Sequence, residues 1–148
     1  MSDSSISRPV MAFDFGERQI GVAVGQHLTA TASPLKILKA RDGIPDWKVV
    51  MALIEEWQPG VLVVGLPYNM DGSESAIAAR ARKFANRLHG RTGLRVELHD
   101  ERLSSFEARQ IGAEDNLQFH GRASRDTTVD AVAAALILES WFRECDAN

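Results

Sequence analysis

The sequence predicts an α/β fold in which a mixed five-stranded sheet is flanked by helices on both faces. Three extended segments come first, with no helical segment between them, which is typical of antiparallel strands. Helical and extended segments then alternate, which is typical of parallel strands joined by crossover helices. The apolar run at residues 61–66 has no polar positions, as expected for a strand covered on both faces.

The first strand carries a carboxylate inside an apolar run. Residues 10–16 read VMAFDFG, so Asp14 stands among β-branched and aromatic residues just before a glycine. An unpaired buried carboxylate is costly to remove from water. Asp14 is therefore paired, binds a cation, or lies at the open end of the strand. The alternative is that Asp14 only caps the backbone of the turn that leads to the second strand, at residues 19–25.

The remaining elements follow from apolar spacing, with turn residues between them. A half-exposed third strand precedes a turn at residues 42–45, where Pro45 suits the first turn of a helix. Ser104 and Glu107 have the spacing of a capping box. The expected strands lie near residues 10–16, 19–25, 33–39, 61–66 and 95–99, and the expected helices near 46–58, 75–88, from 104 and from 127.

Length and composition indicate one domain of an ordinary globular protein. Of the 148 residues, 45% are hydrophobic and 25% are charged. Residues 1–8 should form a loose tail and residues 9–144 the domain. The single cysteine, Cys145, excludes an internal disulfide framework and suits a reducing compartment. With no bilayer-spanning run and no signal-peptide pattern, a cytoplasmic location without membrane contact is expected.

Carboxylates from separate segments are expected at one edge of the sheet. Asp14 and the triplet Asp100-Glu101-Arg102 follow strands, and Asp130 lies in the first turn of the last helix. Active sites of such sheets lie beyond the carboxyl ends of the strands. Oxygen ligands with little sulfur or histidine nearby select Mg²⁺ or Mn²⁺. Two such ions can support phosphodiester cleavage.

Each carboxylate also has a purely structural interpretation. Asp130 could complete a helix cap begun by Thr127, and it would complement the helix dipole. Glu101 could form an ion pair with Arg102. Convergence of all three carboxylates at one edge favours the metal site.

The charge distribution is uneven. The net charge is −3, which argues weakly against a nucleic-acid partner. No acidic residue lies between Glu74 and Glu97, however, and six of the 17 basic residues fall there: Arg80, Arg82, Lys83, Arg87, Arg91 and Arg95. Such a patch can attract a phosphate backbone although the whole chain is acidic. The alternative is a solvated helix face.

Four segments together carry a family resemblance: residues 14–23 (DFGERQIGVA), 63–67 (VVGLP) with Asp71-Gly72, 100–104 (DERLS) and 129–134 (VDAVAA). In this order they resemble the YqgF family, whose members are described as Holliday junction resolvases or pre-16S ribosomal RNA nucleases related to RuvC. The resemblance implies the ribonuclease H-like fold, one or two divalent metal ions, and a catalytic and metal-binding triad of Asp14, Glu101 and Asp130. Candidate substrate-binding residues are Arg18 and Arg102 within the motifs, and Arg80, Lys83 and Arg87.

The chain departs from the family pattern before the last helix. Family members carry a basic Lys-Gly-Lys stretch there, whereas this chain has Asp126-Thr127-Thr128, with basic residues only at Arg122 and Arg125. The extra carboxylate disfavours tight contact between this segment and a phosphate.

The expected function is that of a metal-dependent endonuclease on structured nucleic acid. The resemblance alone places processing of the 5′ end of pre-16S ribosomal RNA, with ribosomal particles as a candidate partner, ahead of resolution of four-way DNA. A non-catalytic RNA-binding module in ribosome assembly or transcription is the alternative from another class. A sugar-kinase-like phosphotransferase is disfavoured, because it needs a second homologous domain. His99 is the only histidine near the motifs, and the oligomeric state is left open.

Overall fold

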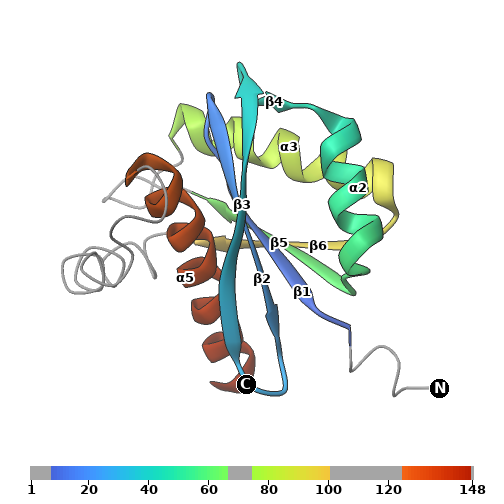
Figure 1. The fold of residues 1–148 in the computed structure, drawn as a ribbon, viewed down its shortest axis with the longest axis vertical. Coiled ribbons are helices and arrows are strands. Elements are labelled where there is room, and N and C mark those ends of the chain that lie inside the picture. Colours follow the sequence, from blue (N-terminus) through green and yellow to red (C-terminus); the bar gives the residue numbers. More distant parts are fainter. Residues whose placement is uncertain (1–7, 67–74, 101–124, 148) are drawn as a thin grey trace.

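A computed structural model of the protein describes residues 8–66, 75–100 and 125–147. Six strands form one mixed sheet in the order β4-β3-β2-β1-β5-β6, with helices on both faces (Figure 1). The fold class predicted from the sequence is confirmed. The strands are β1 (Val10–Asp14), β2 (Gln19–Gln26), β3 (Thr31–Arg41), β4 (Ile44–Pro45), β5 (Val61–Leu66) and β6 (Arg95–Asp100), and the helices are α2 (Trp47–Trp57), α3 (Ala76–Thr92) and α5 (Arg125–Ala147).

The sheet combines an antiparallel and a parallel half. β1, β2 and β3 form the expected antiparallel meander. β1 also pairs parallel with β5, and β5 pairs parallel with β6. The carboxyl ends of β1, β5 and β6 therefore lie at the same edge of the sheet.

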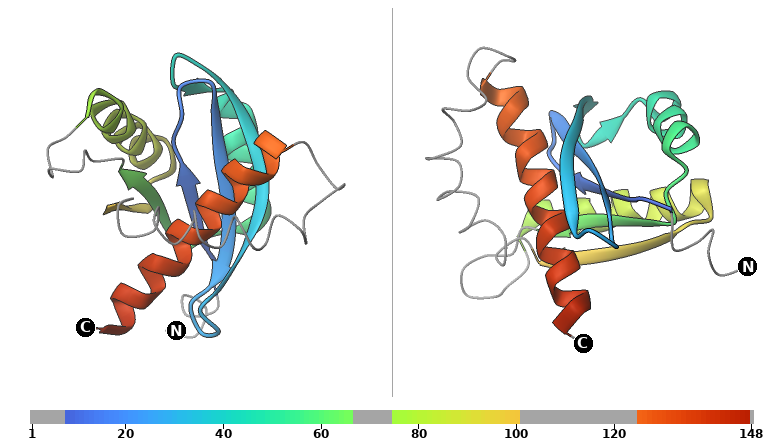
Figure 2. Two further views of the ribbon diagram at one scale, coloured as in Figure 1. Left: turned by 90° about the vertical axis from the view of Figure 1, so that its left-hand side faces the viewer. Right: turned by 60° about the horizontal axis from the view of Figure 1, so that its bottom comes forward.

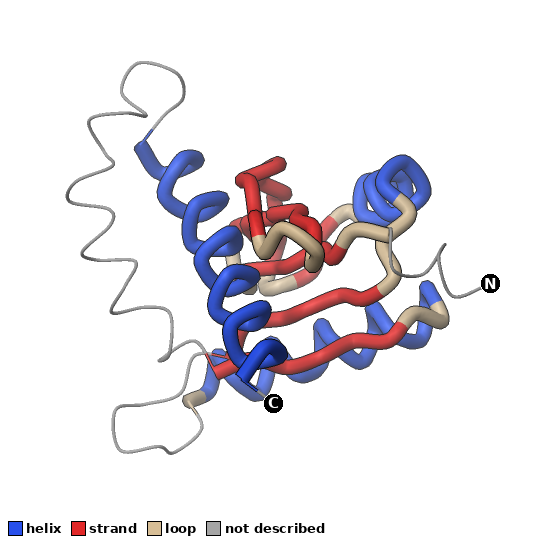
Figure 3. Tube along the Cα trace, turned by 90° about the horizontal axis from the view of Figure 1, so that it is seen from below, coloured by secondary structure: helices blue, strands red, loops and turns tan. Residues whose placement is uncertain are grey.

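The two faces of β1 contribute to different cores. Met11 and Phe13 pack in the core beneath α2 and α3. Val10 and Ala12 pack with Ile137 and other residues of α5 on the opposite face (Figures 2 and 3). Side chains alternate between the two faces along a strand. Asp14, two residues after Ala12, therefore lies on the same face as Ala12, which is the face that α5 covers.

The sequence predicts five strands, but the sheet has six. The additional strand is the short β4. The sequence predicts a turn at residues 42–45, with Pro45 opening the helix. Instead, Asp42 (φ 51°) and Gly43 (φ 80°) form a two-residue hairpin loop, and Ile44 and Pro45 pair with the end of β3. Positive φ at both loop residues suits the right-handed twist of a hairpin. Proline is tolerated in β4 because β4 lies at the sheet edge.

The helices begin close to the expected positions, and one of them is longer. α2 is capped by Asp46, whose side chain accepts from the Lys48 backbone N–H. α3 starts after Ser75 as expected but continues through Gly90 to Thr92, since Gly93 is the residue that adopts the left-handed cap (φ 71°). One glycine inside a helix costs only about 1 kcal/mol.

Two expected features lie outside the described residues. These are residues 1–7 of the expected tail at residues 1–8, and the helix expected from Ser104. Within the described part of the chain, no helix has both the length and the apolar composition needed to cross a membrane.

The hairpin loop at Gly43 gives a stability prediction. A Cβ at residue 43 would lie 2.7 Å from Cζ of Phe15, and the left-handed φ would be strained as well. We expect Gly43→Ala to lower the free energy of unfolding by about 1–3 kcal/mol. The measurement is urea denaturation. Gly90→Ala is the matched control, because a Cβ there meets nothing within 4 Å and should be neutral or stabilising. Equal stability of the two variants would contradict this account of the loop.

Candidate functional site

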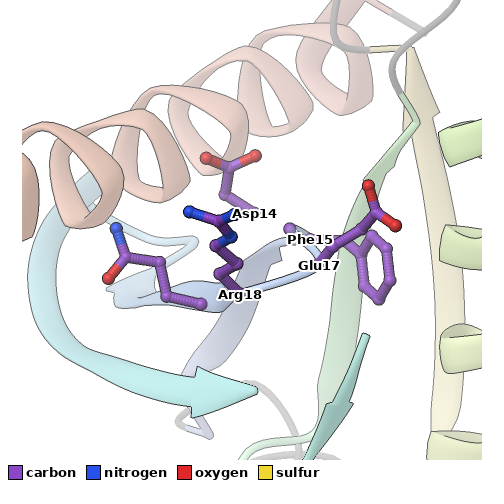
Figure 4. Close-up of a pocket in the computed structure, with 6 residues that line it drawn as sticks. Asp14, Phe15, Glu17 and Arg18 are labelled. Atoms are coloured by element: carbon purple, nitrogen blue, oxygen red, sulfur yellow. The ribbon is translucent and has the colours of Figure 1, made fainter. Parts of the chain in front are cut away.

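Asp14 ends β1 at the edge where the parallel strands have their carboxyl ends. It is partly buried, and its backbone pairs with Gly21 of β2. Figure 4 shows its carboxylate directed toward the helix above the sheet, which is α5. The side chain is therefore presented on the face that α5 covers, and it borders an open hollow of about 330 Å³ lined by the residues from Asp14 to Gln19.

The turn after Asp14 is held rigidly by its neighbours. Phe15 is buried in the core beneath α2 and α3, with its ring centroid 5.6 Å from that of Phe84. At Gly16, a Cβ would lie 2.5 Å from the Gln19 carbonyl oxygen, so the turn has no room for a side chain. The backbone that carries Asp14 therefore leads directly into a closely packed turn.

Two backbone hydrogen bonds join this turn to the neighbouring hairpin. The Gly43 N–H donates to the Glu17 carbonyl (2.9 Å), and the Ala40 N–H donates to the Arg18 carbonyl (2.8 Å). The hairpin of β3 and β4 thus supports the turn through backbone hydrogen bonds.

The turn also contacts α3 through an ion pair. The Arg80 guanidinium pairs with the Glu17 carboxylate, and both side chains are about half exposed. Sequence reasoning missed this role of Glu17, since an exposed acid beside a basic residue gives no specific signal. In Figure 4, Arg18 lies on the same side of the turn as the Asp14 carboxylate, which keeps it a candidate for substrate contact.

The other two members of the predicted triad are described less fully. β6 ends at Asp100, opposite Leu66, so the chain leaves the sheet at the Asp14 edge. Glu101 and Arg102 follow directly and lie outside the described residues. Asp130 lies on α5, the helix that Asp14 faces. Within the described ranges no three His, Cys, Asp or Glu side chains gather at one point, so the metal triad stays a prediction.

The predicted basic residues occupy one stripe of α3. Arg80, Lys83 and Arg87 are exposed and share a helix face, because residues three or four apart are neighbours. α3 packs on the face of the sheet opposite α5. Arg87 is seven residues from Arg80, or about 10 Å further along the helix. Arg80 is thus the member of the stripe nearest the Asp14 turn.

Two other basic residues of this segment are engaged within the protein. The Arg91 guanidinium lies 4.5 Å from the centroid of the Trp47 ring. Arg95 pairs with Glu97 along β6. These interactions weaken the argument that the whole segment is a substrate surface.

His99 joins the sheet to α5 instead of lining the hollow. It is 3% exposed, its Nε2 lies 2.9 Å from Oγ of Ser140, and its Nδ1 lies 3.2 Å from a carboxylate oxygen of Glu144. Both partners belong to α5. The sequence places His99 near the motifs, but it gives no sign of these partners, which lie more than 40 residues later in the chain.

Comparisons with known proteins connect this geometry to a family. The model of the family described as "RuvX: Holliday junction resolvase" matches residues 8–144. A protein of Pectobacterium carotovorum subsp. carotovorum (strain PC1) is 57% identical over 137 residues, which cover 92% of this chain and 96% of that protein. A protein of Escherichia coli (strain K12 / DH10B) is 54% identical over 139 residues, which cover 94% of this chain and 99% of that protein. Both carry the name "Putative pre-16S rRNA nuclease".

Solved structures are similar in fold. Thermus thermophilus RuvC in complex with a Holliday junction substrate superposes with a TM-score of 0.56 and 19% identity, covering 93% of this chain and 96% of that chain. The yeast mitochondrial Holliday junction resolvase Ydc2 gives a TM-score of 0.58 and 12% identity, and the match covers 93% of this chain and 78% of that chain. At these identities the likeness concerns the fold alone.

The contacts of His99 predict a structural and not a chemical role. His99→Ala should lower the free energy of unfolding by about 1–3 kcal/mol, because it leaves buried Ser140 without this partner. Nuclease activity below the melting temperature should stay within about tenfold of wild type, whereas loss of a general base typically costs 10²–10⁴-fold. Thermal denaturation and cleavage rates measure the two effects. His89→Ala is the control, because His89 is exposed. It should lower the free energy of unfolding by less than His99→Ala does. A His99→Ala protein that is folded but inactive would contradict the structural role.

Proposed function

This chain belongs to the RuvX family, and from that premise we propose that it is a metal-dependent endonuclease that processes the 5′ end of pre-16S ribosomal RNA. The observation that carries the proposal is the Asp14 carboxylate. It sits at the carboxyl edge of the sheet, beside an open hollow, on a turn fixed by Phe15 and by hydrogen bonds from the neighbouring hairpin. The substrate is inferred from the names of relatives that are 54–57% identical to this chain.

The donor set fits a hard divalent cation. Asp14 supplies oxygen donors at an accessible position, and Asp130 lies on the helix that Asp14 faces. We infer that Asp14, Glu101 and Asp130 would hold one or two Mg²⁺ or Mn²⁺ ions. Such ions supply Lewis-acid activation of water and stabilise charge on the leaving oxygen.

The protein's own residues would bind and orient the phosphodiester. Arg102 directly follows Glu101, and Arg18 lies four residues after Asp14. Both would bind the flanking phosphates. Arg80 would act near the turn, and Lys83 and Arg87 would bind phosphates further from the cut. In-line attack of water on phosphorus breaks the bond to the 3′ oxygen, so the products would carry a 5′-phosphate and a 3′-hydroxyl. Neither ring nitrogen of His99 is required for this step.

A four-way DNA junction is the second candidate substrate. The family description names this activity, although the resolvases of similar fold share only 12–19% of their sequence with this chain. Both substrates therefore belong in the cleavage assay. A non-catalytic RNA-binding module, the remaining alternative, would bind RNA without cutting it.

The role of Asp14 can be tested by a change of charge without a change of shape. Asp14→Asn should abolish Mn²⁺-dependent cleavage of a pre-16S leader RNA while the protein stays folded, because the change removes one ligand charge. Millimolar Mn²⁺ should raise the melting temperature of wild type and have less effect on the variant, since a ligand that binds only the folded state stabilises it. Cleavage assays on RNA and on four-way DNA, with end analysis of the products, measure the outcome.

Asp42→Asn is the matched control, because it makes the same chemical change in an exposed loop where asparagine also tolerates positive φ. It should cleave like wild type. A cleaving Asp14→Asn variant, or products that end in a 2′,3′-cyclic phosphate, would contradict metal-dependent hydrolysis. Wild type that binds RNA but cuts neither substrate would favour the non-catalytic module.

The basic stripe of α3 gives a separate prediction. Replacing Arg80, Lys83 and Arg87 with serine should weaken binding to structured RNA. It should also flatten the salt dependence of binding, by about 0.7–0.9 in log–log slope for each phosphate that the variant no longer neutralises. Binding titrations across a range of salt concentrations measure both effects.

A control for the stripe removes the same charge elsewhere. Serine at Arg8, Lys36 and Lys48 changes three exposed basic residues that lie outside α3. If both triple variants bind RNA with equally reduced affinity, only net charge matters, and the stripe is a solvated helix face.

A further inference from the structure

β6 is one of the two outer strands of the described sheet, at the edge opposite β4. On one side it pairs with β5, and on the other side no described strand accompanies it; β6 is the gold strand in Figure 2. An unpaired edge offers a row of backbone N–H and C=O groups to any extended segment that approaches it.

Edges are commonly protected against strand pairing by charged side chains, by proline or by a bulge. β6 has no proline and no bulge in its register with β5, and its charged residues Arg95 and Glu97 are of opposite sign. Here Leu94, Val96 and Leu98 alternate along the face that α3 covers, and Leu98 is 40% exposed. Beside them is an open hollow of about 520 Å³, lined by Gly93, Arg95, Val96 and Leu98 together with Ala85, Asn86 and His89 of α3. A partner for this edge should therefore be an extended polypeptide that places an apolar side chain in the hollow.

We propose that β6 pairs antiparallel with β6 of a second copy of this chain, on a two-fold axis at Val96. Val96 then lies opposite Val96 of the second copy. Leu98 lies opposite Leu94 of the second copy, and Arg95 lies opposite Glu97 of the second copy. The two sheets become one continuous sheet.

Charge selects this register. Residues directly opposite in an antiparallel pair share a face, and like charges there are destabilising. An axis at Arg95 or at Glu97 would place identical charges opposite each other, and an axis at Leu98 would place Val96 opposite Asp100. With the axis at Val96, apolar residues meet apolar residues and each charge meets its opposite. Arg95 and Glu97 already pair along the strand in one chain, so their side chains share a face and can exchange partners.

The hollow beside β6 receives a side chain in this arrangement. Leu98 of the second copy lies opposite Leu94, next to Gly93 and His89, which line the hollow. The symmetry repeats this contact, so two exposed leucines become buried. The apolar surface removed from water favours association.

The dimer also has a consequence for the site. Because the paired strands run in opposite directions, the carboxyl edges of the two sheets face away from each other. If the Asp14 edge is catalytic, as proposed above, the two sites would make separate cuts and not a coordinated pair of cuts.

Disulfide trapping tests the register directly. In a Cys145→Ser background, Val96→Cys should form a covalent dimer on mild oxidation, because two directly opposed residues are within disulfide reach. Leu98→Cys is the matched control. Its partner cysteine would be four residues away along the strand, about 13 Å, and should not crosslink. Efficient crosslinking at residue 98 and none at residue 96 would overturn the register.

A charge exchange tests the interface without cysteine. Wild type should sediment as a dimer in the micromolar range. Arg95→Glu or Glu97→Arg alone should weaken dimerisation by about tenfold, because two cross-strand pairs become repulsive. The variant that carries both Arg95→Glu and Glu97→Arg should dimerise as strongly as wild type. A monomeric wild type, or a double variant no better than the single ones, would overturn the proposal and leave the edge to another partner. Neither outcome depends on nuclease activity.

Discussion

The two-residue period of β1 is the constraint on which the candidate site depends. It buries Met11 and Phe13 beneath α2 and α3, and it buries Val10 and Ala12 beneath α5. Both faces of the strand are therefore committed, and a shift by one residue would exchange every side chain between the faces. Asp14 takes the α5 face because of this alternation. The packing of these apolar residues thus directs the carboxylate toward the helix that carries Asp130.

The rigidity of the site comes from the segment that follows Asp14. Phe15 anchors the turn in the core, Gly16 allows it to close, and Glu17 links it to Arg80 on α3. The same short motif therefore provides a presented carboxylate and the contacts that hold it in place. Preorganised groups need no rearrangement when charge develops during a reaction. In this turn, therefore, Asp14 is the carboxylate that we propose for catalysis, and Phe15, Gly16 and Glu17 hold the turn in place.

Much of the fold could be predicted from the sequence, because apolar periodicity reports burial directly. The positions of β1, β2, β5 and β6, the starts of α2, α3 and α5, and the family resemblance are confirmed. Local geometry was harder: Asp42-Gly43 forms a hairpin loop where only a turn is predicted, and Gly90 does not end α3, because a glycine ends a helix only where its φ turns positive. The contacts of His99 with Ser140 and Glu144, and of Glu17 with Arg80, join residues more than 40 positions apart, which spacing alone cannot reveal.

We propose that Asp14 binds a divalent cation together with acids from other segments. A crystal structure with Mn²⁺ tests this, because anomalous scattering locates the metal. We predict a manganese peak with an Asp14 carboxylate oxygen at about 2.1 Å, a distance typical of small hard divalent cations, and with Glu101 and Asp130 as further ligands. Manganese bound only elsewhere, with the Asp14 carboxylate occupied by protein groups, would contradict the account.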